Sequence, residues 1–212
     1  MKKTKRGRDM ARRVRPRLSL TDFVDIALKV GPQKATKISQ IKNRGDYTPA
    51  VDYYRKLRNQ IIETHQENRS RAHFRRLIFD VPLEKLRNYD IIREGYSKWW
   101  GRKELKWFEP ATCLYEKHGI EVNINPELGL LINDEPHLIK LYFKSESLSK
   151  NKVNITLHLM NISLNDMYEE DITMSILDIR NSKLITATHH DPMLDASVDG
   201  ELAYIAALWA SV

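Results

Sequence analysis

The apolar residues in the first half of the chain recur at intervals of three and four, which is the period of an amphipathic α-helix. Ser19 or Thr21 can cap a first helix, which Gly31 and Pro32 would end. A short basic helix is predicted over residues 34–43. A long amphipathic helix is predicted over about residues 50–73.

The apolar period changes from 3.6 to 2 after Pro110. Apolar and polar residues alternate over residues 120–124, 128–132 and 139–143, and turn residues such as Asn, Pro and Asp separate these segments. The pattern predicts a three-stranded β-meander at about residues 112–144.

Helices and strands alternate over the rest of the chain. Residues 82–100 predict a helix, and residues 172–179 and 183–188 predict a pair of strands. Residues 147–163 satisfy both periods; the helix is favoured and the strand remains an alternative. Residues 195–209 predict a closing helix. The fold class expected is α+β, with a helical basic N-terminal region followed by an antiparallel or mixed β-meander sheet flanked by helices.

Composition excludes several classes of protein. The chain has 212 residues, of which 42% are hydrophobic, with 8 Gly, 8 Pro and a single Cys. It is therefore neither a disordered chain, a collagen-like repeat nor a disulfide scaffold. No apolar stretch is long enough for a membrane span or for the core of a signal peptide, so no membrane partner and a cytoplasmic location are expected.

The formal net charge of +7 conceals a separation of charge along the chain. Residues 1–110 carry 28 basic and 13 acidic side chains, whereas residues 111–212 carry 7 basic and 15 acidic ones. We expect a flexible basic arm at residues 1–18, a basic helical region at residues 19–81, and an α+β domain at residues 82–212.

A basic arm ahead of helices with basic faces indicates binding to nucleic acid, DNA or RNA, because each contact with a phosphate releases condensed counterions. The side chains expected to make these contacts are Lys2, Lys3, Lys5, Arg6, Arg8, Arg12, Arg13, Arg15, Arg17, Arg55, Lys56 and Arg58.

Two segments carry a resemblance to a known family. Asn125-Pro126-Glu127-Leu128-Gly129 contains a Pro-acid pair, and the predicted strand that follows presents Lys140 on its polar face. Together with the order helix, meander, helix, strand, these segments resemble the restriction-endonuclease-like PD-(D/E)xK nuclease superfamily over about residues 83–180. They also resemble uncharacterised bacterial proteins, which implies no function.

The nuclease resemblance implies a magnesium-dependent phosphodiesterase site. In it, Glu127 and a second acid would bind the metal, and Lys140 would stabilise developing charge or position the attacking water. This chain departs from the family pattern at Leu138, where the family places its second metal carboxylate. Three acids could substitute for the missing carboxylate: Glu121, Asp178 and Glu94.

Two non-enzymatic functions remain open beside a nuclease. The chain could be a nucleic-acid-binding module or accessory subunit, or the separation of charge could support assembly into a homo-oligomer. The sequence lacks the dinucleotide-binding glycine motif, the phosphate-binding P-loop and paired C-x-x-C motifs, so nucleotide-dependent and zinc-dependent enzymes are poorly supported.

Overall fold

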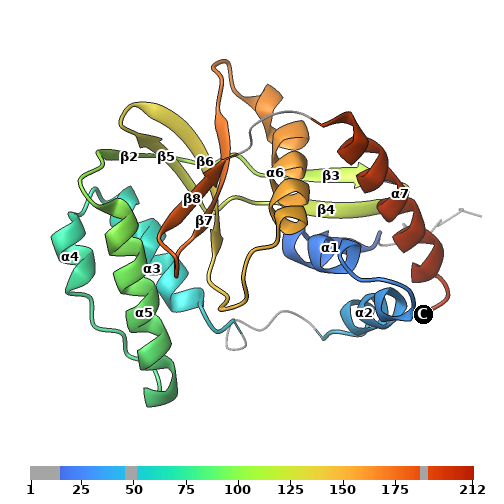
Figure 1. Cartoon of the computed structure of the whole chain (residues 1–212), viewed down its shortest axis with the longest axis horizontal. Coiled ribbons are helices and arrows are strands. Elements are labelled where there is room, and N and C mark those ends of the chain that lie inside the picture. The colour runs from blue at the N-terminus through green and yellow to red at the C-terminus, as the bar shows by residue number, and fades with distance from the viewer. Residues whose placement is uncertain (1–14, 46–51, 187–190) are drawn as a thin grey trace, which may run out of the picture.

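The computed structural model describes residues 15–45, 52–186 and 191–212 (Figure 1). The described residues before Gly101 form five helices: α1 (Leu20–Ala27), α2 (Pro32–Lys42), α3 (Arg55–Gln66), α4 (Arg71–Arg75) and α5 (Leu83–Trp100). The remaining helices are α6 (Lys150–Leu164) and α7 (Pro192–Trp209), with one 3-10 turn at Asn165–Met167. The strands are β1 (Arg17–Ser19), β2 (Leu105–Phe108), β3 (Cys113–Lys117), β4 (Ile120–Ile124), β5 (Leu128–Ile132), β6 (Glu135–Tyr142), β7 (Thr173–Asp178) and β8 (Lys183–Thr186).

These elements confirm the α+β class and form two sheets. A three-stranded sheet has the order β1-β4-β3, and a five-stranded sheet has the order β2-β5-β6-β7-β8. All neighbours are antiparallel except β1 with β4 and β6 with β7. The parallel pair β6–β7 is joined through α6, as a crossover connection requires.

The three strands predicted around residues 112–144 are present, but they are divided between the two sheets. β4 pairs with β3, whereas β5 pairs with β6. The chain passes from the first sheet to the second between Ile124 and Leu128. Alternation of apolar residues identifies a strand but not its neighbour, which is why the sequence did not reveal this division.

The strand β1 differs from the prediction of a flexible arm over residues 1–18. Its three residues pair in parallel with Glu121–Asn123 of β4, and Leu18 is only 1% exposed. Burial of this one leucine fixes the register of the strand. Arg17 and Leu18 therefore do not belong to a flexible arm, and residues 1–14 lie outside the described part of the chain.

The long helix predicted over residues 50–73 is interrupted. α3 ends at Gln66, and α4 begins only at Arg71. Asn68 between them has a positive φ of 51°, a conformation that asparagine tolerates better than most residues. The Ser70 hydroxyl then caps α4 by accepting a hydrogen bond from the His73 amide.

The other predicted elements are confirmed. Residues 147–163 are helical: α6 is capped by the Ser149 hydroxyl, and its buried residues Val153, Leu157 and Leu164 follow the helical period. The helix predicted over residues 82–100 and the closing helix also form, as α5 and α7. The strands β7 and β8 pair as expected over the described residues.

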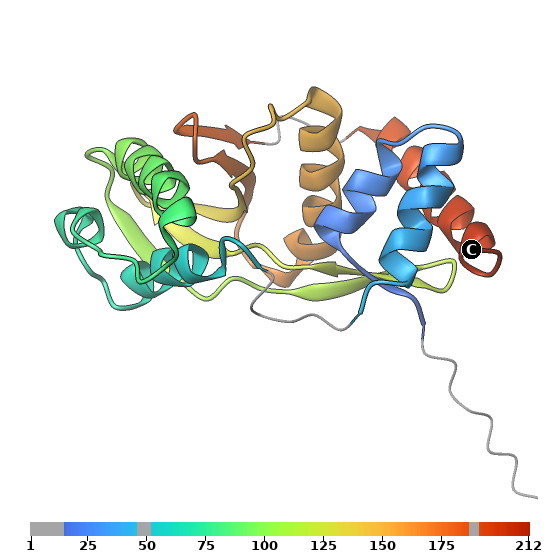
Figure 2. The same cartoon turned by 90° about the horizontal axis from the view of Figure 1, so that it is seen from below.

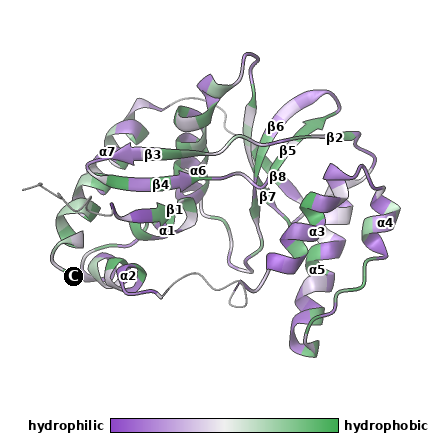
Figure 3. Ribbon diagram, turned by 180° about the vertical axis from the view of Figure 1, so that it is seen from behind, coloured by the Kyte–Doolittle hydropathy of each residue, from purple (hydrophilic) through white to green (hydrophobic). Residues whose placement is uncertain are grey.

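The core consists of two apolar clusters on the two faces of the five-stranded sheet. One cluster joins α1, α6 and α7 to the three-stranded sheet and to Leu138 and Ile176; the other joins α3 and α5 to Ile139 and Leu177. Figures 1 and 2 show α3, α4 and α5 on one side of this sheet and α1, α2, α6 and α7 on the other. Coloured by hydropathy, α4 is mainly hydrophilic (Figure 3).

Candidate functional site

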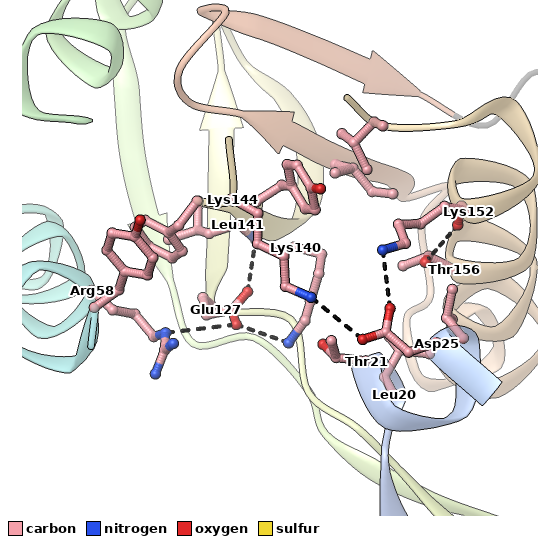
Figure 4. A pocket seen from close by; sticks show the side chains of 16 residues that line it. Leu20, Thr21, Asp25, Arg58, Glu127, Lys140, Leu141, Lys144, Lys152 and Thr156 are labelled. Atoms are coloured by element: carbon pink, nitrogen blue, oxygen red, sulfur yellow. Dashed lines mark hydrogen bonds and ion pairs between the residues drawn. The ribbon is translucent and has the colours of Figure 1, made fainter. Parts of the chain in front are cut away.

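A pocket of about 190 Å³ lies between α1 and α6 on one side and the start of α3 on the other (Figure 4). Its walls come from α1, the start of α3, β6 with the loop that follows it, and α6. Six charged residues line it: Asp25, Arg58, Glu127, Lys140, Lys144 and Lys152.

The predicted pair Glu127 and Lys140 is in direct contact. Because β5 and β6 are antiparallel neighbours, the residue before β5 lies beside Lys140, and the Glu127 amide donates to the Ile139 carbonyl at 3.0 Å. Lys140 Nζ donates to Glu127 Oε1 at 2.8 Å, while the other carboxylate oxygen accepts from the Leu141 amide at 2.8 Å. Both side chains are 13% exposed.

Lys140 also holds the segment between β4 and β5. Its Nζ donates to the Asn125 carbonyl at 2.8 Å and to the Asn125 side-chain oxygen at 3.2 Å. With Glu127, these oxygens supply three acceptors for the three N–H donors of the ammonium group. Lys140 is therefore satisfied within the protein and forms part of the pocket wall.

Asp25 lies across the pocket from Glu127 and is not among the site residues that the sequence predicts. Lys152 Nζ donates to its Oδ1 at 3.0 Å, and Lys144 Nζ lies 3.4 Å from its Oδ2. Burial raises the pKa of Asp25, but the two lysines outweigh burial and the pKa is lowered overall. These partners are 127 and 119 residues away in the sequence, so no local pattern could have connected them.

Arg58 reaches the pocket from α3. Its Nη1 donates to Asp52 Oδ2 at 2.7 Å, and its guanidinium carbon lies 5.7 Å from the centre of the Phe143 ring. Its Nε is buried, makes no hydrogen bond within the described residues, and lies 3.9 Å from Glu127 Oε1. The guanidinium is thus held in place by Asp52 and Phe143, with Nε directed toward the pocket carboxylate.

The other acids considered for a metal site do not line this pocket. Glu121 belongs to the three-stranded sheet, where its Oε2 accepts from Arg17 Nε at 3.0 Å. Asp178 is buried at the end of β7, where it accepts from the Asn181 side chain at 2.8 Å and closes the turn before β8. Glu94 of α5 lines a different pocket.

The carboxylates of this pocket, as they stand, do not fit a magnesium ion. Glu127 and Asp25 each accept from lysine ammonium groups, and a divalent cation would have to displace those groups to reach the oxygens. Over residues 15–45, 52–186 and 191–212, no group of three or more His, Cys, Asp or Glu side chains is arranged to hold a metal.

The side chains expected to contact nucleic acid do not form one group in the described part of the chain. Arg58 is in the pocket, Arg17 is paired with Glu121, Arg15 forms an ion pair with Glu116, and Lys56 donates to the Asp80 carbonyl. Arg55 is exposed at the start of α3. The remaining seven lie outside the described residues: Lys2, Lys3, Lys5, Arg6, Arg8, Arg12 and Arg13.

No protein-family model and no curated protein matches this chain. The resemblance to PD-(D/E)xK nucleases therefore remains a prediction from the two sequence segments. In the part of the chain that is described, no helix combines the length and the apolar character needed to cross a membrane.

Proposed function

We propose that this protein binds nucleic acid and that the pocket between α1, α3, β6 and α6 accepts phosphate groups of the backbone. One observation carries the proposal: four cationic side chains from separate segments converge on a concave site that has only two acids among its described lining residues. These cations are Arg58, Lys140, Lys144 and Lys152. An excess of positive charge in a partly enclosed site favours a phosphate anion.

The lysines of the pocket divide into two roles. Lys140 uses its three donors on Asn125 and Glu127. Lys144 and Lys152 each direct one donor at Asp25, so each ammonium retains N–H groups for phosphate oxygens. Lys144 is 45% exposed and Lys152 is 16% exposed, which puts one at the mouth of the pocket and the other deeper within it.

The basic residues 1–14 add a second source of affinity that does not depend on the pocket. They carry seven of the predicted phosphate contacts, and Arg15 and Pro16 separate them from β1. Since each phosphate contact contributes a slope of about 0.7 to 0.9 to the plot of log affinity against log salt concentration, deletion of these residues should weaken binding and flatten the plot.

The pocket is tested by the triple variant Asp25→Asn/Lys144→Gln/Lys152→Gln, which removes the two lysines together with the acid that they neutralise. Fluorescence anisotropy with labelled single- and double-stranded DNA and RNA measures affinity across a salt series. We expect the slope of log affinity against log salt to fall by about 1.4 to 1.8, the value for two lost phosphate contacts.

The matched control is Lys29→Gln/Lys183→Gln, which removes two exposed lysines that do not line the pocket. This variant should keep the slope of the natural protein. Equal slopes and affinities for the pocket variant and the control would show that phosphates do not enter the pocket.

A metal-dependent nuclease is the second candidate, because the nuclease resemblance assigns roles to Glu127 and Lys140. It requires the metal to displace the Lys140 ammonium from the Glu127 carboxylate. The same oligonucleotides are incubated with magnesium or manganese, and cleavage is followed on denaturing gels. Cleavage that disappears in Glu127→Gln would support this candidate. Binding without cleavage in either metal would leave a non-enzymatic binding protein.

A further inference from the structure

A second basic pocket lies between α4, α5 and the turn that joins β7 to β8. It has a volume of about 640 Å³ and is lined by four cations and a single acid among the described residues. The cations are Arg71, Arg75, Lys98 and Arg180, and the acid is Glu94. Both pockets are lined by four cations, but the second has one acid among its described lining residues and the first has two.

Three of these cations are not engaged by any other residue that the structure describes. Arg71, Arg75 and Lys98 make no side-chain hydrogen bond or ion pair with any described residue, whereas Arg69 on the same segment contacts Glu63 at 3.4 Å. Arg75 and Lys98 are exposed, and Arg71 is half-buried. Their charges are therefore available to an anion in solution.

The fold holds these side chains on one surface. Arg71 and Arg75 are four residues apart on α4 and so lie on the same face of the helix. Phe74 between them is fully buried and packs edge-to-face on Tyr96 of α5, with ring centres 5.3 Å apart. Anchored in this way, α4 presents its two arginines beside Lys98.

The third wall of this pocket is the turn between β7 and β8, and its position depends on Gly95 of α5. A Cβ atom at Gly95 would overlap the carbonyl oxygen of Ile179, so only glycine allows the turn after β7 to approach α5 this closely. The Ser182 hydroxyl donates to the Gly95 carbonyl at 2.9 Å and fixes the turn there.

Arg180 connects this pocket to the first one. Its Nε donates to the Phe143 carbonyl at 2.8 Å, and its Nη2 donates to the Tyr54 hydroxyl at 3.1 Å. Phe143 and Tyr54 both line the first pocket, while Arg180 lines the second. The two pockets are thus neighbours that are linked by the hydrogen bonds of Arg180.

We infer that the second pocket binds another part of the phosphodiester backbone of the same nucleic acid, so that one strand contacts both pockets across Arg180. This inference rests on the proposed function. Arginine is suited to this role because its planar guanidinium can donate two hydrogen bonds to one phosphate. Arg71, Arg75 and Lys98 have no acidic partner among the described residues, so their charges can be neutralised by a polyanion.

The test is the variant Arg71→Gln/Arg75→Gln/Lys98→Gln, compared with Arg76→Gln/Arg87→Gln/Lys183→Gln. Both variants lose two arginines and one lysine, and each has substitutions on or beside α4 and on α5, but the control residues line neither pocket. Circular dichroism and thermal melting check that both variants fold.

Affinity is measured by fluorescence anisotropy for DNA and RNA oligonucleotides of increasing length across a salt series. For the natural protein, affinity should rise once the oligonucleotide is long enough to reach both pockets. In the pocket variant this rise should disappear, and the slope of log affinity against log salt should fall by about 2 to 3. The control variant should retain both properties.

The outcomes separate the two proposals. No binding of any oligonucleotide by the natural protein would overturn the proposed function and this inference together. Binding that weakens in the variant of the first pocket but keeps its length dependence and slope in the variant of the second would overturn this inference alone. Competition by polyglutamate as effective as that by nucleic acid, lost in the second-pocket variant, would also overturn it by identifying an acidic polypeptide as the partner.

Discussion

The ion pair between Glu127 and Lys140 should contribute more to stability than an ion pair on the surface. Both side chains are 13% exposed and their charged atoms are 2.8 Å apart. A hydrogen bond that involves a charged group contributes about 1.5 to 3 kcal/mol when it is shielded from water, whereas an exposed pair contributes about 0.2 to 1 kcal/mol. We therefore expect a coupling energy of about 2 kcal/mol between these residues.

A double-mutant cycle of Glu127→Gln, Lys140→Met and the double variant measures this energy. Urea unfolding is followed by tryptophan fluorescence and by circular dichroism, and coincident curves justify a two-state treatment. The free energy of unfolding of a chain of this size falls by about 3 kcal/mol per molar urea. A variant that loses about 2 kcal/mol of this free energy therefore unfolds at a midpoint about 0.7 M lower in urea.

The pair Lys106 and Asp134 is the matched control. Its charged atoms are 2.9 Å apart, but its side chains are 52% and 75% exposed. The corresponding cycle, with Asp134→Asn and Lys106→Met, should give a clearly smaller coupling, because solvent screens an exposed pair. If both pairs gave the same small coupling energy, burial would not strengthen the ion pair between Glu127 and Lys140, and the expectation of a stabilising contact would be wrong.

Three further predictions concern stability. Burial lowers the pKa of His65 to about 4, below its ordinary value of 6.5, so the unfolded chain binds more protons between these pH values. The contribution of His65 to stability should be full above pH 6.5 and fall by up to about 3 kcal/mol toward pH 4, so urea titrations of His65→Phe should show a correspondingly smaller loss. Gly95→Ala should lower the melting temperature by several degrees through its overlap with Ile179, whereas Gly200→Ala on α7, where a Cβ meets open space, should raise it slightly. Because the pKa of Asp25 is lowered overall, Asp25→Asn should be less stable than the natural protein near neutral pH, and urea titrations should show this deficit vanish as pH falls through the folded pKa.

Much of the secondary structure could be predicted because it depends on local signals. Ser19 caps α1, as expected, and the apolar period over residues 147–163 produces α6. The break at Asn68 was missed because asparagine is compatible with a helix and with a left-handed turn alike. The division of the strands between two sheets depends on long-range packing, which alternation does not encode.

The candidate site was predictable only in part, for the same reason. Glu127 and Lys140 are 13 residues apart, with Glu127 directly before β5 and Lys140 on the neighbouring strand β6, so their proximity follows from a hairpin. Asp25 reaches the pocket only because β1 and α1 pack beside strands from the second half of the chain. Pairing with Glu121 also removes Arg17 from the expected set of free phosphate contacts.

The hydrogen bonds of Lys140 to Asn125 have a mechanical consequence. Asn125 is the first residue after β4 in the three-stranded sheet, while Lys140 belongs to the five-stranded sheet. The lysine therefore holds the segment between the sheets against β6 and limits rotation of one sheet relative to the other. A ligand that drew this ammonium away from Asn125 would remove that restraint, so occupancy of the pocket would change how freely the two sheets move relative to each other.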